Sequence, residues 1–425
     1  MRAKLVLAVL DGAADRPSRG PTPLERARKP ALDYISSRGA CGLMYPVRRG
    51  VAPESDVAVM SILGYDPFVH YTGRGPIEAV GAGVEFRDGD VALRCNFATL
   101  EGWEVVDRRV GRSLTTEEAA ELARAVEERV RLTSHPCDLE FRATVGHRAV
   151  LVLRGRGVGL SANISNTDPA YARLGGLGVA EARPSRELRW SEPLDGSEEA
   201  RRTAELVNEF TRRAREVLEG HPINVKRAAE GRARANGVLC RDAGDRLPKL
   251  EPVEARFGLS FACLADMPVE KGVAKLVGME VEEVPPGRSL EDYRLRASRA
   301  AEALERHDAV YVHLKGPDEA GHDGDLELKV EALELIDEGF FSPLLDYVDL
   351  SSTLICVTSD HATPCDLRAH SDDPVPIAVC GPGVEPDGVA CFSEGACAGG
   401  RLGIIERGVE LMPLLAKLAG AREPK

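Results

Sequence analysis

The strongest constraint on the fold is a set of short apolar runs that alternate with longer amphipathic segments. The runs are rich in β-branched residues, and we expect each to form a strand: residues 4–10, 149–153, 309–314 and 352–358. Continuous apolar strands are typical of a parallel sheet buried on both faces. We therefore expect all four runs to belong to such a sheet.

Three amphipathic segments predict long helices between the strands, at residues 115–132, 198–218 and 290–305. The first opens with the capping box Thr115-Thr116-Glu117-Glu118, and Ser289 with Asp292 three residues later begins the third. Strands that alternate with helices predict an α/β fold.

The length of the chain predicts two domains, because 425 residues exceed the size at which one hydrophobic core usually stops growing. The middle of the chain carries many Arg and Gly residues, whereas the two ends carry Asp and His in distinctive settings. This predicts one discontinuous domain, residues 1–64 and 256–425, and a second domain inserted over residues 65–255.

Charge and hydropathy exclude some classes of partner. The net charge of −13 argues against nucleic acid and anionic membranes as partners, although a local arginine cluster can still bind a small anion. No stretch is apolar for long enough to span a bilayer. The first apolar run is too short for a signal peptide and ends at Asp11, so we expect a cytoplasmic protein. The ten cysteines form no C-x-x-C pair, and we expect most to be buried thiols; whether any are disulfide-bonded stays open.

Three aspartates follow three of the apolar runs: Asp11, Asp318, and Asp360 with His361 beside it. In parallel sheets, ligands bind beyond the carboxyl ends of the strands, so these carboxylates can converge. His322 and His370 add imidazoles. Mixed Asp and His ligands suit Mn²⁺, Zn²⁺ or Co²⁺, and such a set exceeds what one tetrahedral zinc requires. Two metals about 4 Å apart would use them all. Taken singly, each aspartate is more often a turn former, and each histidine a structural residue.

With these residues in place, the chain resembles the archaeal-type phosphoglycerate mutases that need no bisphosphoglycerate, a branch of the alkaline phosphatase superfamily. The resemblance runs nearly end to end. It is carried by these segments: Asp11-Gly12, Asp15-Arg16-Pro17, Thr22-Pro23-Leu24, Pro53-Glu54-Ser55-Asp56, Gly64-Tyr65-Asp66-Pro67, Tyr71-Thr72-Gly73-Arg74-Gly75, Arg94-Cys95-Asn96-Phe97, Asp107-Arg108-Arg109, His313-Leu314-Lys315-Gly316, residues 318–323, Asp360-His361 and His370-Ser371.

The resemblance implies an alkaline-phosphatase-like, mostly parallel sheet sandwiched by helices, with an inserted smaller α/β domain that faces the metal domain across a cleft. It implies that Ser55 is transiently phosphorylated. Two divalent metal ions (Mn, Zn, Co or Mg) are implied, and no bisphosphoglycerate. The implied ligands are Asp11, Ser55, Asp360 and His361 for one metal, and Asp318, His322 and His370 for the other.

The matching segments also contain the candidate substrate-binding residues Arg74, Arg94, Arg108, Arg109, Arg112 and Lys315. One departure stands near Tyr293, where related sequences tend to carry a lysine and this chain has Arg294 and Arg296. A substrate-binding cation of another type is one interpretation of that change.

The implied function is an isomerase that interconverts 3-phosphoglycerate and 2-phosphoglycerate in glycolysis and gluconeogenesis through a phosphoserine. A small phosphorylated metabolite is then the partner, and the oligomeric state stays open. The alternatives are a metal-dependent phosphatase or another phosphoryl-transferase of the superfamily acting on a different metabolite, and a metal-stabilised scaffold without catalysis. Ser55 itself is also open to the interpretation of an ordinary helix N-cap.

Overall fold

The computed structural model describes residues 2–17, 20–174, 177–181 and 185–421. The chain divides into two compact units. Unit 1 comprises Met1–Tyr71, Leu250–Asp266 and Val273–Lys425, and unit 2 comprises Thr72–Lys249 and Met267–Gly272. The assignment of metal binding to one unit and of substrate binding to the other stays a prediction.

Unit 1 is built on an eight-stranded sheet in the order β11-β10-β12-β1-β13-β14-β2-β15. Only β14 runs against its two neighbours, and every other pairing is parallel. The strands are β1 (Lys4–Leu10), β2 (Gly39–Met44), β10 (Phe261–Leu264), β11 (Glu280–Glu282), β12 (Ala309–Leu314), β13 (Thr353–Ser359), β14 (Val375–Cys380) and β15 (Gly403–Ile405).

The register of the three central strands positions the site. Leu10, the last residue of β1, pairs with Leu314 at the end of β12 and with Ser359 at the end of β13. The carboxyl ends of three neighbouring strands therefore lie level, and the loops that follow them start from one edge of the sheet.

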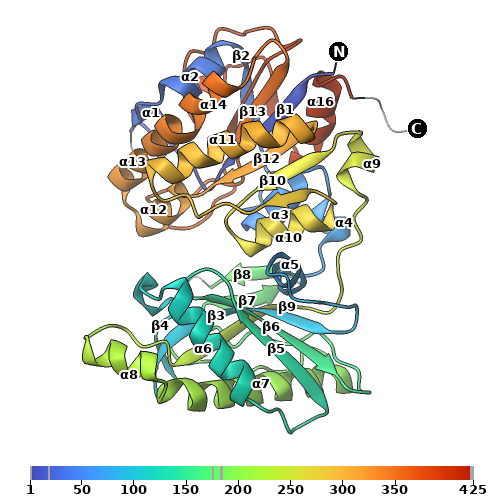
Figure 1. The fold of residues 1–425 in the computed structure, drawn as a ribbon, viewed down its shortest axis with the longest axis vertical. Helices are drawn as coiled ribbons and strands as arrows, with labels where there is room; N and C mark the ends of the chain where they lie inside the picture. Colours follow the sequence, from blue (N-terminus) through green and yellow to red (C-terminus); the bar gives the residue numbers. More distant parts are fainter. Residues whose placement is uncertain (1, 18–19, 175–176, 182–184, 422–425) are drawn as a thin grey trace. The chain divides into compact units, whose positions relative to one another are not determined.

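Helices cover the unit 1 sheet, and α11 crosses its central strands (Figure 1). One apolar core joins Val6, Ala8 and Leu10 of β1 to residues of α2, α11, α13 and α14. The helices are α1 (Pro23–Arg26), α2 (Pro30–Ser37), α3 (Ser55–Ile62), α4 (Pro67–His70), α9 (Val253–Phe257), α11 (Leu290–Arg306), α12 (Pro317–Asp323), α13 (Leu326–Ile336), α14 (Ser342–Tyr347), α15 (Glu394–Cys397) and α16 (Leu411–Leu418). Helix α10 (Pro268–Leu276) is divided: its residues up to Gly272 belong to unit 2 and the rest to unit 1. The predicted α/β class with a mostly parallel sheet is confirmed.

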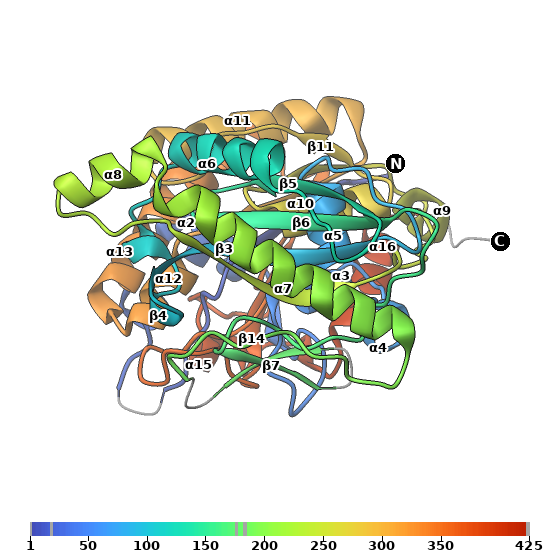
Figure 2. The same cartoon turned by 90° about the horizontal axis from the view of Figure 1, so that it is seen from below.

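Unit 2 has an antiparallel sheet in which β3 lies between β6 and β9, with β5 beyond β6 and β4 paired to the end of β3. Figure 2 shows α6 and α7 lying over this sheet, and α5 packs on it through a second apolar cluster. The elements are α5 (Arg74–Gly81), β3 (Val91–Glu101), β4 (Glu104–Asp107), α6 (Thr116–Arg129), β5 (Cys137–Ala143), β6 (Arg148–Gly155), β7 (Tyr171–Leu174), β8 (Leu177–Ala180), α7 (Glu198–Glu219), α8 (Pro222–Ala229) and β9 (Gly237–Gly244).

The expected strand at residues 149–153 exists as β6, but its expected place in a parallel sheet is wrong. Ala149, Leu151 and Leu153 face the core under α6 and α7, while Val150 and Val152 face α5. The strand is apolar throughout because both of its faces are covered, and burial on two faces does not depend on strand direction.

The other sequence-based elements are confirmed. The strands at residues 4–10 and 309–314 are β1 and β12, and the third is β13. The three predicted helices are α6, α7 and α11, and the capping boxes at Thr115 and Ser289 are both formed. All ten cysteines are free thiols, eight of them buried. Within the described ranges, no helix combines the length and the apolar character needed to cross a bilayer.

Candidate active site

The predicted metal ligands all belong to unit 1 and come from four segments of the chain. Asp11 and Asp360 directly follow β1 and β13, and both are buried. Asp318 does not end a strand: it is the second residue of α12, four residues beyond β12, on the same turn as His322. Ser55 is the first residue of α3, and Glu54 occupies the N-cap, so the interpretation of Ser55 as an N-cap serine is wrong.

One group of side chains gathers around the Nε2 atom of His361. This atom lies 3.3 Å from Asp360 Oδ2, 3.6 Å from Asp11 Oδ1 and 3.4 Å from Ser55 Oγ. These four residues are the set expected to hold one metal, and the structure brings them together.

A second group gathers at the Oδ1 atom of Asp318. His370 Nε2 and His322 Nε2 lie 3.4 Å and 3.5 Å from it, and 3.2 Å from each other. The Nδ1 atom of His370 donates to the carbonyl of Pro53 (2.8 Å), and that of His322 donates to the carbonyl of Arg368 (3.0 Å). Because a carbonyl only accepts, both Nδ1 atoms carry a proton. Burial lowers the pKa of His370, but its hydrogen bond with Asp318 and the charge of Glu54 outweigh this and raise that pKa to about 10, so His370 Nε2 also carries a proton and donates to Asp318.

This arrangement fits divalent cations. In the second group two imidazoles and a carboxylate face one another, and a divalent cation between them would take the place of the proton on His370 Nε2. In the first group, Asp11 Oδ1 and Asp360 Oδ2 are buried and accept no hydrogen bond from any described residue. Ligand atoms within 4.8 Å of one another form two candidate groups, Asp318, His361 and His370, and Asp11, His313 and Asp360.

The pKa values of the first group are shifted because these ionisable side chains are buried close to one another. Burial and the charge of Asp11 raise the pKa of Asp360 to about 7. Burial also raises the pKa of Asp11, but the Lys315 ammonium, 3.0 Å from Oδ2, and His313 together outweigh it and hold that pKa well below its usual range. Burial and the charge of His370 lower the pKa of His361 to about 3. Asp11 is therefore ionised at neutral pH while Asp360 still holds its proton in part, and a cation bound between them would favour the ionised form of both.

His313 belongs to this geometry although the sequence reasoning did not name it as a ligand. Its Nε2 lies 3.6 Å from Asp11 Oδ1 and 3.8 Å from Asp360 Oδ2, and its Nδ1 lies 2.7 Å from the hydroxyl of Tyr311. The signal was available, because a buried histidine inside an apolar strand stands two residues before Lys315 and shares its face.

The arginines near Tyr293 are not placed as the substrate-binding cation that the sequence suggested. Arg296 is fully buried, pairs with Asp266 and donates to the carbonyls of His313 (2.9 Å) and Pro285 (2.8 Å). Arg294 is exposed, with Glu338 3.8 Å away. Arg296 is thus a buried structural cation and not a free substrate ligand.

The predicted substrate-binding arginines all lie in unit 2. Arg74 and Arg94 are both buried and share Glu78, with Nε to Oε1 distances of 2.8 Å and 3.4 Å. Burial and the charges of Arg241 and Arg74 lower the pKa of Arg94 to about 9. Its Nε and Nη1 atoms are buried and form no hydrogen bond with a described residue. This cluster carries more positive than negative charge.

Arg108 shares its contacts with Arg241, a residue that was not predicted from the sequence. Arg108 forms an ion pair with Asp168, and Arg241 lies 3.9 Å from the same carboxylate. Both guanidinium groups lie over the ring of Tyr171, at 4.9 Å and 3.7 Å from its centre. Arg241 reaches this face because it pairs with Arg94 across β3 and β9, a pairing that no local pattern reveals.

Arg109 and Arg112 lie in and beside a short 3₁₀ turn, Val110–Arg112. Burial and the charges of nearby arginines, among them Arg109 and Arg112, lower the pKa of His147 to about 2. The positive region therefore extends from Arg94 to this turn.

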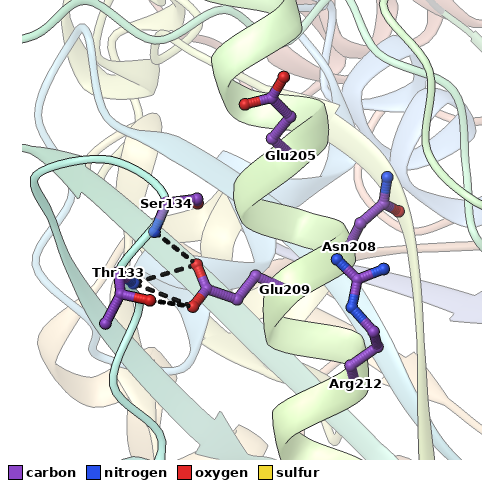
Figure 3. A pocket seen from close by; sticks show the side chains of 6 residues that line it. All are labelled: Thr133, Ser134, Glu205, Asn208, Glu209 and Arg212. Atoms are coloured by element: carbon purple, nitrogen blue, oxygen red, sulfur yellow. Dashed lines mark hydrogen bonds between the residues drawn. The ribbon is translucent and has the colours of Figure 1, made fainter.

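A shallow pocket elsewhere on unit 2 is lined by none of the predicted site residues (Figure 3). Its centre is Glu209 on α7, whose carboxylate accepts from the backbone N–H groups of Thr133 and Ser134 at 2.9–3.0 Å. These hydrogen bonds attach the loop that contains Thr133 and Ser134 to α7.

Carboxylates and imidazoles gathered at the carboxyl ends of parallel strands, with an α/β unit inserted in the chain, define an α/β protein with a candidate metal site. The model of the family "2,3-bisphosphoglycerate-independent phosphoglycerate mutase" matches residues 36–224. The curated 2,3-bisphosphoglycerate-independent phosphoglycerate mutase of Aeropyrum pernix is 49% identical over 98% of this chain and 100% of its own length. The chain belongs to the family of 2,3-bisphosphoglycerate-independent phosphoglycerate mutases, which are isomerases.

Two solved structures share the fold along the whole chain. The PH0037 protein from Pyrococcus horikoshii is 31% identical, with a TM-score of 0.77 over 99% of this chain and 98% of its own. The cofactor-independent phosphoglycerate mutase from Thermoplasma acidophilum is 34% identical, with a TM-score of 0.59 over 98% of this chain and 100% of its own.

Proposed function

We propose that this chain interconverts 3-phosphoglycerate and 2-phosphoglycerate without bisphosphoglycerate, by passing the phosphoryl group through Ser55. The observation that carries the proposal is the place of the Ser55 hydroxyl. It lies 3.4 Å from His361 Nε2, within the group that contains Asp11 and Asp360. A structural serine has no need of that position.

Two divalent cations would be held by the two ligand groups. Asp11, Ser55, Asp360 and His361 would hold one, and Asp318, His322 and His370 the other. The mixture of carboxylate and imidazole ligands favours Mn²⁺, Zn²⁺ or Co²⁺ over Mg²⁺. When bound, such cations neutralise the charge of a transferring phosphoryl group and lower the pKa of a nearby hydroxyl.

The reaction would run in two halves. Ser55 Oγ gives up its proton and attacks phosphorus, the bond from phosphorus to the C3 oxygen of the substrate breaks, and that oxygen takes up a proton to become a hydroxyl. This leaves phospho-Ser55 and bound glycerate. In the second half, the C2 hydroxyl of glycerate gives up its proton and attacks the same phosphorus, the bond to Ser55 Oγ breaks, and Oγ takes up a proton to restore the serine. The product is 2-phosphoglycerate.

The substrate carries a carboxylate and a phosphate, and the arginines of unit 2 are suited to both. The guanidinium forks of Arg74, Arg94 and Arg108 can pair bidentately with such groups. Arg94 is the strongest candidate, because its buried Nε and Nη1 atoms have no hydrogen bond with a described residue. Arg109, Arg112 and Lys315 complete the proposed set. Retention of glycerate by these cations separates a mutase from a phosphatase, in which water takes the phosphoryl group.

The test is to incubate Mn²⁺-loaded protein with 3-phosphoglycerate and to measure 2-phosphoglycerate and free phosphate. We expect 2-phosphoglycerate without added bisphosphoglycerate, and loss of the activity in Ser55→Ala. Ser61→Ala, on the same helix α3, is the matched control. Free phosphate alone would instead identify a phosphatase.

The proposal also gives the partner and the location of the protein. The partner is a small phosphorylated metabolite, and the enzyme would act in the cytoplasm.

A further inference from the structure

We infer that Thr363 is a positioning residue that couples the two ligand groups, and that Lys329 holds it in place. This inference rests on the proposed two-metal site. Thr363 lies two residues after His361 and is fully buried. Neither residue has a predicted role in the site.

The Thr363 hydroxyl connects one member of each ligand group. It donates to Asp318 Oδ1 at 2.7 Å, and it lies 3.0 Å from His361 Nδ1. A hydroxyl has a single hydrogen, and the Asp318 carboxylate accepts the hydrogen bond that it donates. The oxygen must therefore accept from His361 Nδ1–H, so that the lone pair of that imidazole is on Nε2. Nε2 is the atom that faces Ser55 and the carboxylates of the first group.

Lys329 fixes the backbone from which this hydroxyl projects. Its ammonium group is fully buried and donates to the carbonyls of Thr363 (2.8 Å) and Ala14 (3.0 Å) and to Asp15 Oδ2 (3.3 Å). Three N–H groups thus meet three acceptors, which offsets the cost of burying the charge. The bonds tie the loop after β13 to the loop after β1, and these loops carry Asp360 and Asp11.

Close packing leaves Thr363 little freedom to move. A Cβ added at Gly12 would lie 2.6 Å from Thr363 Oγ1 and 2.8 Å from Asp318 Oδ1, and one added at Gly321 would lie 2.4 Å from the Thr363 carbonyl oxygen. Gly12 also has a φ of +58°, which side chains with a Cβ rarely adopt. The two glycines let the backbone reach the hydroxyl and hold it against both ligand groups.

Replacement of Thr363 separates this role from a packing role. Thr363→Val keeps the shape and removes the hydroxyl, and Thr363→Ser keeps the hydroxyl. Thr353→Val removes a buried threonine hydroxyl from the opposite end of β13 and is the matched control. Mn²⁺ affinity and stoichiometry would be measured by calorimetry, the visible spectrum of the Co²⁺-loaded protein would report ligand geometry, and thermal unfolding of the metal-free proteins would report folding.

We expect Thr363→Val to weaken Mn²⁺ binding at both sites by about 10- to 100-fold and to change the Co²⁺ spectrum, as the loss of groups that orient ligands does elsewhere. Thr363→Ser should restore binding, and Thr353→Val should bind as wild type does. Lys329→Met should weaken both sites as well.

Wild-type affinity at both sites in a folded Thr363→Val protein would overturn the inference and leave the proposed function standing. Weakening at one site only would overturn the coupling. A wild-type protein that binds no Mn²⁺ would overturn the proposed metal site and this inference together.

Discussion

Replacing Arg296 with methionine should destabilise unit 1 by about 3–5 kcal/mol, the typical cost of removing one partner of a buried ion pair. Arg296 is fully buried, and its removal leaves the Asp266 carboxylate buried, with the N–H of Gly287 as a donor at 3.1 Å. The substitution also removes the hydrogen bonds to the carbonyls of His313 and Pro285. Methionine fills much of the vacated volume, so the loss is mainly electrostatic.

Urea unfolding followed by far-ultraviolet circular dichroism would measure this loss. Arg294→Met is the matched control, because Arg294 is exposed on the same helix, and its effect should stay within about 0.5 kcal/mol. In the double variant with Asp266→Asn neither charge remains, and its loss should be smaller than the sum of the single losses by about 0.5–3 kcal/mol. A loss below about 1 kcal/mol for Arg296→Met, or strict additivity in the double variant, would refute the argument.

Two further predictions concern acid stability and metal removal. Burial raises the pKa of Glu209, but the hydrogen bonds of its carboxylate with Ser134 and Thr133 outweigh this and lower the pKa from 4.5 to about 2. The stabilising contribution of Glu209 is therefore full above pH 4.5 and is lost as the pH falls toward 2. Glu209→Gln should therefore lower the free energy of unfolding by about 1–3 kcal/mol at pH 7 and flatten its decline between those pH values, and an unchanged acid profile would contradict this. Chelation of the metals should lower the thermal midpoint, because each site saturated at about 100 times its dissociation constant stabilises the fold by about 2.7 kcal/mol. Differential scanning calorimetry with and without Mn²⁺ checks this, and equal midpoints would contradict it.

The sequence was sufficient to locate Asp11 and Asp360, because both follow apolar strands directly and parallel strands end at one edge. Asp318 was harder to place, since the strand before it ends at Leu314 and the residue belongs to the next helix. The distance of 2.7 Å that joins Asp318 to Thr363 depends on the approach of two loops, and a linear sequence carries no signal for such an approach.

Long-range pairing explains most of the remaining differences. The apolar pattern of β6 reports that both faces are buried, but strand direction depends on partners elsewhere in the chain. Arg241 joins Arg94 only through the register of β9 with β3, and those strands are separated by most of unit 2. Local patterns therefore predicted the elements and the carboxylates at the strand ends well, and they failed where strands distant in sequence pair.

The topology of unit 1 has a consequence for synthesis on the ribosome. β1 is made first, yet its two neighbours in the sheet, β12 and β13, are among the later segments to be translated. Unit 2 lies almost wholly in one stretch, Thr72–Lys249, and its strands emerge together. Domains made as continuous stretches generally fold as they leave the ribosome, whereas long-range pairings form late. The arginine cluster can therefore assemble on the nascent chain. The apolar strand β1 stays exposed until β12 and β13 have been translated. The proposed metal ligands cannot come together until His370 has been translated.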